Sequence, residues 1–398
     1  MSERAKDIAR GAPVAPSFTL ACAFACAVGA SACTSFPDVS TVLDLRVLAV
    51  KTDPPDVFLR VTGLPADPTT PPDPRALGID PASIPPIHVT PLIVDPSVDI
   101  TTVRFALSVC PNNPYGAAPP NSVMGGMMDP GGGANNTVGS TLCDDARVRL
   151  SPLLDLHNEG PMPADVQLSS DDLLTAFKSD VFLDQFGHPH GGFDLGMPLN
   201  FQVTASDGVQ MVKAVKRVVF WAQHWPDQQL NQIPTIPSVS LFGHRDDATF
   251  ALSDPAGTLD ATPAPHAVLG TGLWLLPKYE DGVTGETYRP TLLNRDPPYQ
   301  VIEGDPVQER IRYAFYATAG HFDPPRTVNQ LIPGTQGTVH LESHYIPPAT
   351  LDEVPVDAAS GMHVVGVWII VRDDRGGESW FSGPSQISGQ IALDPPSP

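Results

Sequence analysis

Proline and glycine interrupt almost every part of this chain, and their density limits what it can fold into. The sequence holds 46 prolines and 33 glycines in 398 residues. Proline lacks a backbone donor and is unfavourable inside helices and central strands. Residues 65–86 contain eight prolines and are predicted to form a long surface loop. This pattern predicts an all-β protein whose short strands are joined by turns and long loops.

The first half of the chain has several strand signals and one helix signal. In residues 101–110 apolar side chains alternate with small or polar ones, which indicates a strand with one buried face. An Asp-Gly turn at 206–208 separates two β-rich runs and indicates a hairpin. A short helix is predicted after Ser169, where a capping oxygen and first-turn acids precede apolar residues with helical spacing. The predicted strands are 44–51, 87–94, 101–110, 199–205 and 209–221.

The second half contains a pattern that resembles the bacterial Ig-like and PKD-like domains. Its predicted strands are 272–276, 310–317, 338–345, 362–372 and 378–381, and Val365, Val367, Ile369 and Val371 share one strand face. The resemblance is carried by an aromatic strand ending in glycine (313–320), a proline-bearing segment after Tyr345 and the Asp-Asp-Arg-Gly-Gly turn (373–377). It covers residues 305–390 and implies a β-sandwich.

Two Ig-like β-sandwich domains in tandem are therefore predicted, at 44–232 and 238–392. Residues 231–237, with two prolines, are the expected junction. The first domain shares only its closing hairpin with the Ig-like pattern. A long loop closed by a disulfide and the short helix are its departures from that pattern.

The N-terminal residues have the layout of an export signal. Basic residues precede an apolar run at 18–29 that is too short to cross a bilayer. The small residues before Cys33 resemble the lipobox of bacterial lipoproteins, which implies a signal peptide at 1–32, a lipid on Cys33 and a tether at 33–43. Thr34 stands where an aspartate would signal inner-membrane retention, so the resemblance implies an outer-membrane lipoprotein of the cell envelope. The alternative is an ordinary signal peptide that leaves Cys33 unmodified.

Cysteine usage is consistent with export. The sequence has five cysteines; two lie in the apolar signal and Cys33 would carry lipid. Cys110 and Cys143 remain, and in an oxidising compartment they are predicted to form a disulfide. The alternative is two reduced thiols. Alternation places Cys110 on the face of Arg104, so the bridge is expected to close the loop 111–142 on the outer side of its sheet.

The charge of the chain limits its partners. The net charge is −21, and removal of residues 1–32 takes away three basic and two acidic groups, which leaves −22. Such a surface repels nucleic-acid backbones and anionic lipid heads. Membrane attachment is therefore expected through the lipid, and any protein partner is expected to present a neutral or basic patch.

Two groups of residues are candidate sites. His340, Glu342 and His344 have period-two spacing, which places them on one face of a strand as possible zinc ligands. The preferred alternative is the solvated face of an amphipathic strand, so no metal or cofactor is predicted. Trp221 and Trp225 are four residues apart and could stack on sugar rings. The alternative is a core tryptophan followed by one at the rim.

Motifs of common enzymes are absent from the sequence. It contains no nucleophile elbow, helical zinc-histidine pair, phosphate-binding loop or dinucleotide fingerprint. Asp373 and Asp374 are interpreted as turn residues rather than calcium ligands. The predicted function is a non-catalytic, lipid-anchored envelope protein with a structural role or a protein or glycan partner. The alternative is a metal-dependent hydrolase that uses the histidines near 340–344.

Overall fold

The computed structural model describes most of the chain after the predicted signal. The described residues are 39–63, 76–111, 143, 150–157, 164–180, 182–183, 189–190, 193, 196–225, 228–278, 285–294, 300–329, 339–358, 360–382 and 389–395. The predicted signal peptide, Cys33 and the tether up to residue 38 lie outside them. Val39–Pro398 form one compact unit.

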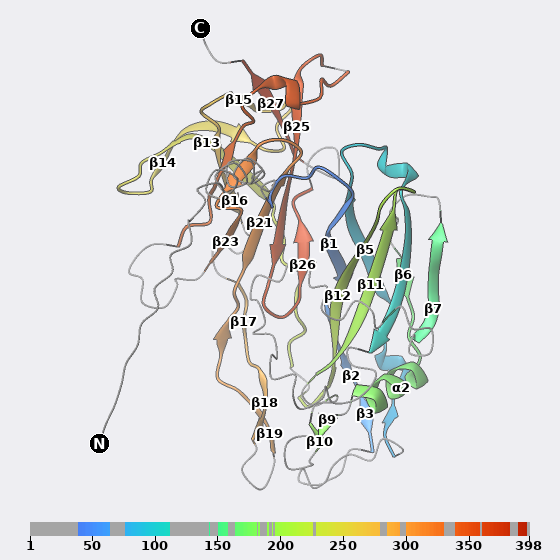
Figure 1. The fold of residues 1–398 in the computed structure, drawn as a ribbon. Helices are drawn as coiled ribbons and strands as arrows, with labels where there is room; N and C mark the ends of the chain where they lie inside the picture. Colours follow the sequence, from blue (N-terminus) through green and yellow to red (C-terminus); the bar gives the residue numbers. More distant parts are fainter. Residues whose placement is uncertain are drawn as a thin grey trace, which may run out of the picture. The chain divides into compact units, whose positions relative to one another are not determined.

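The first half of the described chain is a sandwich of two sheets (Figure 1). Its elements are β1 (Arg46–Asp53), β2 (Asp56–Leu59), β3 (Val61–Thr62), β4 (Gly78–Ile79), η1 (Pro81–Ser83), β5 (Ile87–Val94), η2 (Ile100–Thr102), β6 (Arg104–Pro111), β7 (Leu150–His157), β8 (Ala164–Val166), α2 (Ser170–Asp180), β9 (Phe182–Leu183), β10 (Pro189–His190), β11 (Met197–Ser206) and β12 (Met211–Ala222). One sheet has the order β1-β5-β8 and the other β2-β12-β11-β6-β7.

Alternation along the strands builds the core of this sandwich. Phe105, Leu107 and Val109 of β6 point to the same side as Phe201 and Val203 of β11, and all five are buried. The core cluster draws apolar residues from both sheets. The two sheets of the first half therefore enclose one hydrophobic layer.

The predicted helix is present as α2, and its N-terminus is capped as expected. The Asp172 backbone N–H donates to Ser169 Oγ at 3.1 Å, and the Ser169 N–H donates to Asp172 Oδ2 at 2.9 Å. Leu173 and Phe177 are buried in the first core.

The second half is also a sandwich of two sheets. Its elements are β13 (Ser238–Arg245), β14 (Leu252–Thr258), β15 (His266–Val268), β16 (Leu273–Lys278), β17 (Thr287–Tyr288), β18 (Thr291–Asn294), β19 (Gln300–Glu303), β20 (Val307–Gln308), β21 (Arg312–Ala317), β22 (His321–Asp323), β23 (Arg326–Val328), β24 (Ser343–Ile346), η4 (Leu351–Glu353), β25 (His363–Arg372), β26 (Glu378–Trp380) and β27 (Gly389–Asp394). The sheet orders are β14-β13-β16-β24-β22 and β15-β27-β25-β21-β23, with β26 paired to β25.

The predicted apolar face of β25 is confirmed. Val365, Val367, Ile369 and Val371 all lie in the second core. The following turn uses Asp373 as predicted, because its Oδ1 accepts the N–H groups of Arg375 at 3.0 Å and Gly377 at 2.6 Å. The chain is all-β with two sandwiches, and both of these predictions are confirmed.

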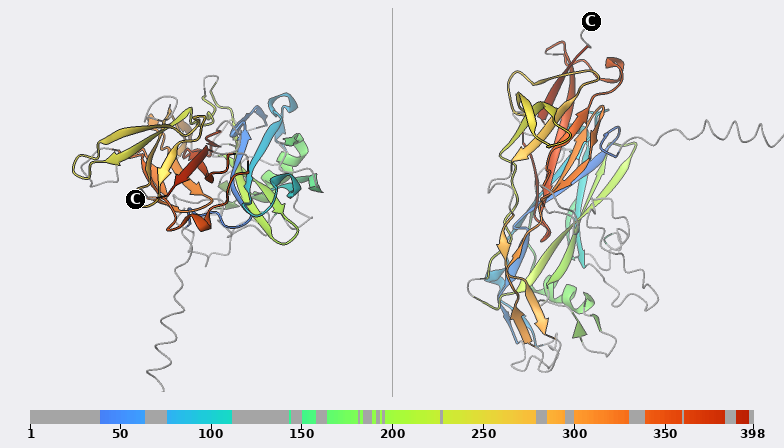
Figure 2. Two further views of the ribbon diagram at one scale, coloured as in Figure 1. Left: turned by 90° about the horizontal axis from the view of Figure 1, so that it is seen from above. Right: turned by 90° about the vertical axis from the view of Figure 1, so that its left-hand side faces the viewer.

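The two sandwiches pack against each other through their middle sheets. Leu48, Ala49 and Leu92, on the face of β1 and β5 that is turned away from the first core, form a third cluster with Trp368 and Ile370 of β25. Strands β1, β5 and β25 are therefore buried on both faces. Seen from above, β1 and β5 lie between β25 and the β12 sheet (Figure 2, left).

The residues just before β1 belong to this packing and not to a tether. Ser40 and Val42 are fully buried. The Val42 N–H donates to the Ala317 carbonyl of β21, and the Ala317 N–H donates to the Ser40 carbonyl, each at 2.8 Å. The predicted tether at 33–43 is thus too long at its C-terminal end, because residues 40–42 pair with a strand of the second half.

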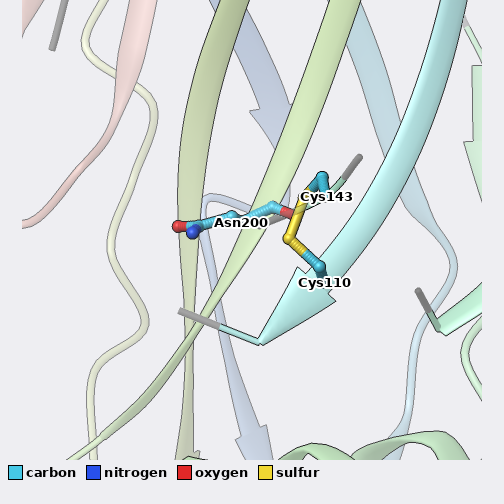
Figure 3. The surroundings of a disulfide bond; sticks show 3 residues. All are labelled: Cys110, Cys143 and Asn200. Atoms are coloured by element: carbon cyan, nitrogen blue, oxygen red, sulfur yellow. A yellow bond between two sulfur atoms is a disulfide. The ribbon is translucent and has the colours of Figure 1, made fainter. Parts of the chain in front are cut away.

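The predicted disulfide between Cys110 and Cys143 is present, with Cα atoms 5.3 Å apart (Figure 3). Cys110 pairs in register with Asn200 of β11, so it lies on the face opposite the first core. The bridge was expected on the outer side of its sheet, but it is not exposed there. Cys110 is 0 % exposed and Cys143 is 2 % exposed. The Cys143 Sγ lies 3.7 Å from the Asn200 carbonyl.

Candidate binding cleft

A cleft of 270 Å³ opens between the segment that follows β12 and a hairpin arm of the second half. The arm consists of the paired strands β17 and β20 and the paired strands β18 and β19. It lies beside the end of the first sandwich that carries β2 and β3 (Figure 1). The cleft is lined by Trp225, Gln228, Gln229, Thr287, Tyr288, Arg289, Glu303 and Pro306.

Gln228 holds the two walls of the cleft together. The Gln228 N–H donates to the Trp225 carbonyl at 3.2 Å, and Gln228 Oε1 accepts the His224 N–H at 3.0 Å. These bonds form a compact turn after β12. Gln228 Nε2 then donates to Thr291 Oγ1 of the arm at 3.1 Å. Both ends of this amide are engaged, so Gln228 positions the site.

Two aromatic side chains line the cleft, one from each half of the chain. Trp225 is half-buried and packs against the His224 ring, with a centroid distance of 5.6 Å. On the arm, the guanidinium of Arg375 lies 4.5 Å from the centroid of the half-buried Tyr288 ring. This contact holds the Tyr288 ring on one side, and Tyr288 also lines the cleft.

The charged side chains of the lining compensate each other. Arg289 Nε lies 3.5 Å from Glu303 Oε1, and Arg289 also donates to the Gly304 carbonyl at 3.4 Å. Both charged side chains are about half exposed. The cleft therefore offers polar groups of both kinds without an excess of either charge.

A largely buried group of charged and polar side chains, here called the junction network, lies next to Tyr288. Its members are Asp56, Asn231, Glu286, Glu309, Asp373 and Arg375. Arg375 forms ion pairs with Glu309, at 2.9 Å, and with Glu286. Asn231 bridges the halves, because its N–H donates to Asp56 Oδ1 at 3.0 Å and its Nδ2 donates to Asp373 Oδ2 at 3.1 Å.

The junction network holds more carboxyl groups than cations, and this shifts their titration. Burial raises the pKa of Asp56 to about 6, despite its bond from Asn231. Burial, with the charge of Asp373, raises the pKa of Glu309 to about 7, and burial also raises the pKa of Asp373. Some of these buried carboxyls are therefore protonated near pH 6.

A second buried ion cluster joins β1, β12 and β26. Glu378 lies between Arg372 and Lys216, with Lys216 Nζ at 3.4 Å, and its Oε2 accepts the Val50 N–H at 3.2 Å. Burial by itself would raise the pKa of Glu378, but Arg372 and Lys216 lower it. Arg372 also donates to the Leu48 carbonyl at 2.9 Å. These contacts hold the sandwich of the second half against the sandwich of the first half.

The two tryptophans singled out in the sequence have different surroundings. Trp225 lines the cleft. Trp221 lies on the face of β12 opposite the first core, where a Cβ atom on Gly196 would be only 2.8 Å from its ring. Trp221 is half-buried and is not among the residues that line the cleft, so only Trp225 of the two tryptophans lies at this site.

His340, Glu342 and His344 do not share the expected strand face. Strand β24 begins at Ser343, so His340 and Glu342 precede it. The Oε1 of Glu342 lies 3.1 Å from His340 Nδ1 and 3.4 Å from Arg245 Nη1. Within the described ranges, no group of three or more histidine, cysteine and acidic side chains is arranged to hold a metal ion.

His344 is committed to other contacts. Its Nε2 lies 3.1 Å from the Thr271 carbonyl, and its ring stacks on Trp274 with centroids 4.5 Å apart. Arg245 lies 3.7 Å from the same Trp274 ring. The Trp274 ring therefore contacts both the His344 imidazole and the Arg245 guanidinium. Burial lowers the pKa of His344, so its imidazole stays neutral at physiological pH.

Comparison with protein-family models, curated proteins and solved structures gives no match for this chain. The resemblance to Ig-like and PKD-like domains and to lipoproteins therefore stays a prediction. In the described part of the chain, no helix has the length and hydropathy of a membrane span.

Proposed function

We propose that this chain is a lipid-anchored, non-catalytic protein of the bacterial cell envelope that binds a protein or glycan partner through the cleft at Trp225. The observation that carries the proposal is the cleft itself, where two aromatic rings and polar side chains from both halves converge. Concave sites in which aromatic rings and hydrogen-bonding side chains lie together are typical of ligand recognition.

The packing around the cleft supports a role in binding. The ion cluster around Glu378 and the junction network connect the two sandwiches with buried hydrogen bonds. A binding site held on rigid elements loses less entropy when a ligand is ordered in it. The arm and the Trp225 turn therefore form a preformed site.

The lipid anchor is tested by replacing its acceptor. We expect a clickable fatty acid fed to expressing cells to label the wild-type chain and to leave Cys33→Ala unlabelled, because the thioether forms only on the cysteine sulfur. Equal labelling of both proteins would contradict the anchor.

The binding role is tested by photo-crosslinking in intact cells. A photoreactive amino acid at Gln229, which is exposed and lines the cleft, is expected to capture a partner. The matched control is the same substitution at Val209, which is 92 % exposed at the distant β11–β12 turn. We expect adducts from Gln229 that are absent from Val209, and their mass identifies the partner.

Two results would overturn the proposed function. One is the same adduct pattern from Gln229 and Val209, which would mean that the cleft captures nothing specific. The other is stoichiometric zinc in the purified protein that is lost in a His340→Ala and His344→Ala double variant, together with turnover in a hydrolase screen. That second result would favour the metal-dependent hydrolase.

A further inference from the structure

We infer that the cleft is a saccharide site that takes one or two uncharged sugar residues, packed against Trp225 and Tyr288. This inference rests on the proposed binding function and names the ligand class of the same site. It depends on the size of the cleft, on the chemistry of its two walls and on its charge balance.

The size of the cleft limits its occupant. Its volume of 270 Å³ is just below the range of about 300–1,000 Å³ typical of small-ligand sites. The cleft is open to solvent along its rim, where Gln229, Thr287 and Glu303 are exposed. A short segment of a longer chain can therefore occupy it while the remainder extends into water.

The two walls have complementary chemistry for a sugar ring. One face of a pyranose presents several C–H groups, which carry a small positive charge and pack on the electron-rich face of an aromatic ring. Trp225 and Tyr288 supply such faces from different elements, the turn after β12 and strand β17. The ring hydroxyls then lie at the edges, where polar side chains are needed.

Polar groups of the right kind surround the two rings. Gln229 offers both a donor and acceptor, and the Thr287 hydroxyl can serve as either. Burial, and next the charge of Asp374, raise the pKa of Tyr288, so its phenol stays protonated and can also donate. Sugar hydroxyls, which both donate and accept, match this mixed set better than an apolar ligand does.

The charge balance favours an uncharged ligand. The cations near the rings already have partners, because Arg289 pairs with Glu303 and Arg375 pairs with two carboxylates. An anionic ligand would meet these acids and the strongly negative chain. A cationic ligand would be repelled by Arg375, which already lies over one face of the Tyr288 ring.

The test is saturation-transfer NMR and calorimetry on the purified full chain. A lipid-anchored chain is purified in detergent, and here the detergent should be a polyoxyethylene ether. Glucoside and maltoside detergents have sugar head groups that would compete for the cleft. The probes are tetrasaccharides of glucose (β-1,4 and α-1,4), of xylose and of N-acetylglucosamine. Tetragalacturonate is the anionic comparison, and choline is the cationic one. We expect at least one neutral tetrasaccharide to bind, and tetragalacturonate and choline to bind at least about tenfold more weakly.

Variants assign the binding to the cleft. Trp225→Ala should weaken it about tenfold or more, and Gln229→Ala about threefold, since each removes one set of contacts. Trp221→Ala is the matched control, because it deletes an indole outside the cleft and should leave the affinity unchanged. Thermal melting of each variant shows whether the fold is retained, and Trp225→Phe, which keeps a stacking ring, should recover part of the affinity.

Three outcomes would overturn the inference. They are no binding of any neutral tetrasaccharide at millimolar concentration, equal or tighter binding of tetragalacturonate or choline, and equal loss in Trp221→Ala and Trp225→Ala. Protein adducts at Gln229 in the crosslinking experiment, without saccharide binding, would leave the proposed function in place and remove only the saccharide.

Discussion

Replacing both Cys110 and Cys143 with alanine is expected to lower the free energy of unfolding of the first sandwich by about 4 kcal/mol. The two residues are 33 positions apart, and a crosslink of that span removes much of the conformational entropy of the unfolded chain. Alanine is small and apolar, so it leaves no unpaired polar group beside the buried Asn200 and Gln202. The decrease in the free energy of unfolding is measured by urea unfolding, with hydrogen exchange of the β6 and β11 amides as the local readout.

The reducing agent provides the control for this experiment. Dithiothreitol should destabilise the wild-type chain by a similar amount and should have no effect on the double variant. A double variant within about 1 kcal/mol of the wild type would contradict the expectation. So would equal sensitivity of both proteins to dithiothreitol, because the bridge would then not be the group that it reduces.

The elements that the sequence predicted well are those that depend on local pattern. The boundaries of β5 match residues 87–94, and β6, β11 and β12 lie within about three residues of their predicted ends. Alternation determines which side chains of such strands enter a core. A capping box and an Asp-Gly turn are likewise local signals, so α2 and the β11–β12 turn could be predicted.

The packing of the two halves could not be predicted in the same way. Leu48 and Val50, on opposite faces of β1, are both buried, which shows that the strand is covered on both sides. A continuous apolar run indicates a strand that is buried on both faces, but it does not identify the strand that covers the second face. In this structure that strand is β25. The same ambiguity explains why residues 40–42 were expected in a tether.

The candidate cleft could be predicted only in part. Trp225 was a sequence candidate, but Tyr288 lies 63 positions later, and no local spacing connects the two. The arm that carries Tyr288 is fixed by Gln228 and by the junction network, and these contacts bring together residues that are distant in sequence. No sequence signal marked Asp56 or Glu309 as buried, so the burial of these two carboxyl groups was not predicted.

The substitution Asp56→Asn is expected to stabilise the protein at pH 7.5 by about 2.4 kcal/mol relative to its effect at pH 4. The pKa of Asp56 is raised by burial from 3.8 in a free side chain to about 6, a difference of about two pKa units. The folded state therefore holds this proton more tightly than the unfolded chain does. The resulting stability is present below pH 4 and is lost as the pH rises through 6.

Asparagine is the right replacement because its side-chain oxygen can accept the same hydrogen bond as the Asp56 carboxylate. Asn231 donates its N–H to Asp56 Oδ1, and the amide oxygen of asparagine keeps that bond without a charge. Asp373, Glu286 and Arg375 act on Asp56 by their charges, and they are unchanged in the variant. The variant therefore removes the titration of Asp56 and keeps the other titrating groups of the junction network.

Urea unfolding of both proteins at pH 4 and pH 7.5 measures this difference. Asp260→Asn, which changes an exposed aspartate, is the control and should differ from the wild type by less than about 0.5 kcal/mol at either pH. A variant at Asp56 that gains nothing between the two pH values would mean that this carboxyl is already ionised without cost. In that case Arg375 would neutralise Asp56 as well as Glu309 and Glu286, and the contact between the sandwiches would not weaken as the pH rises.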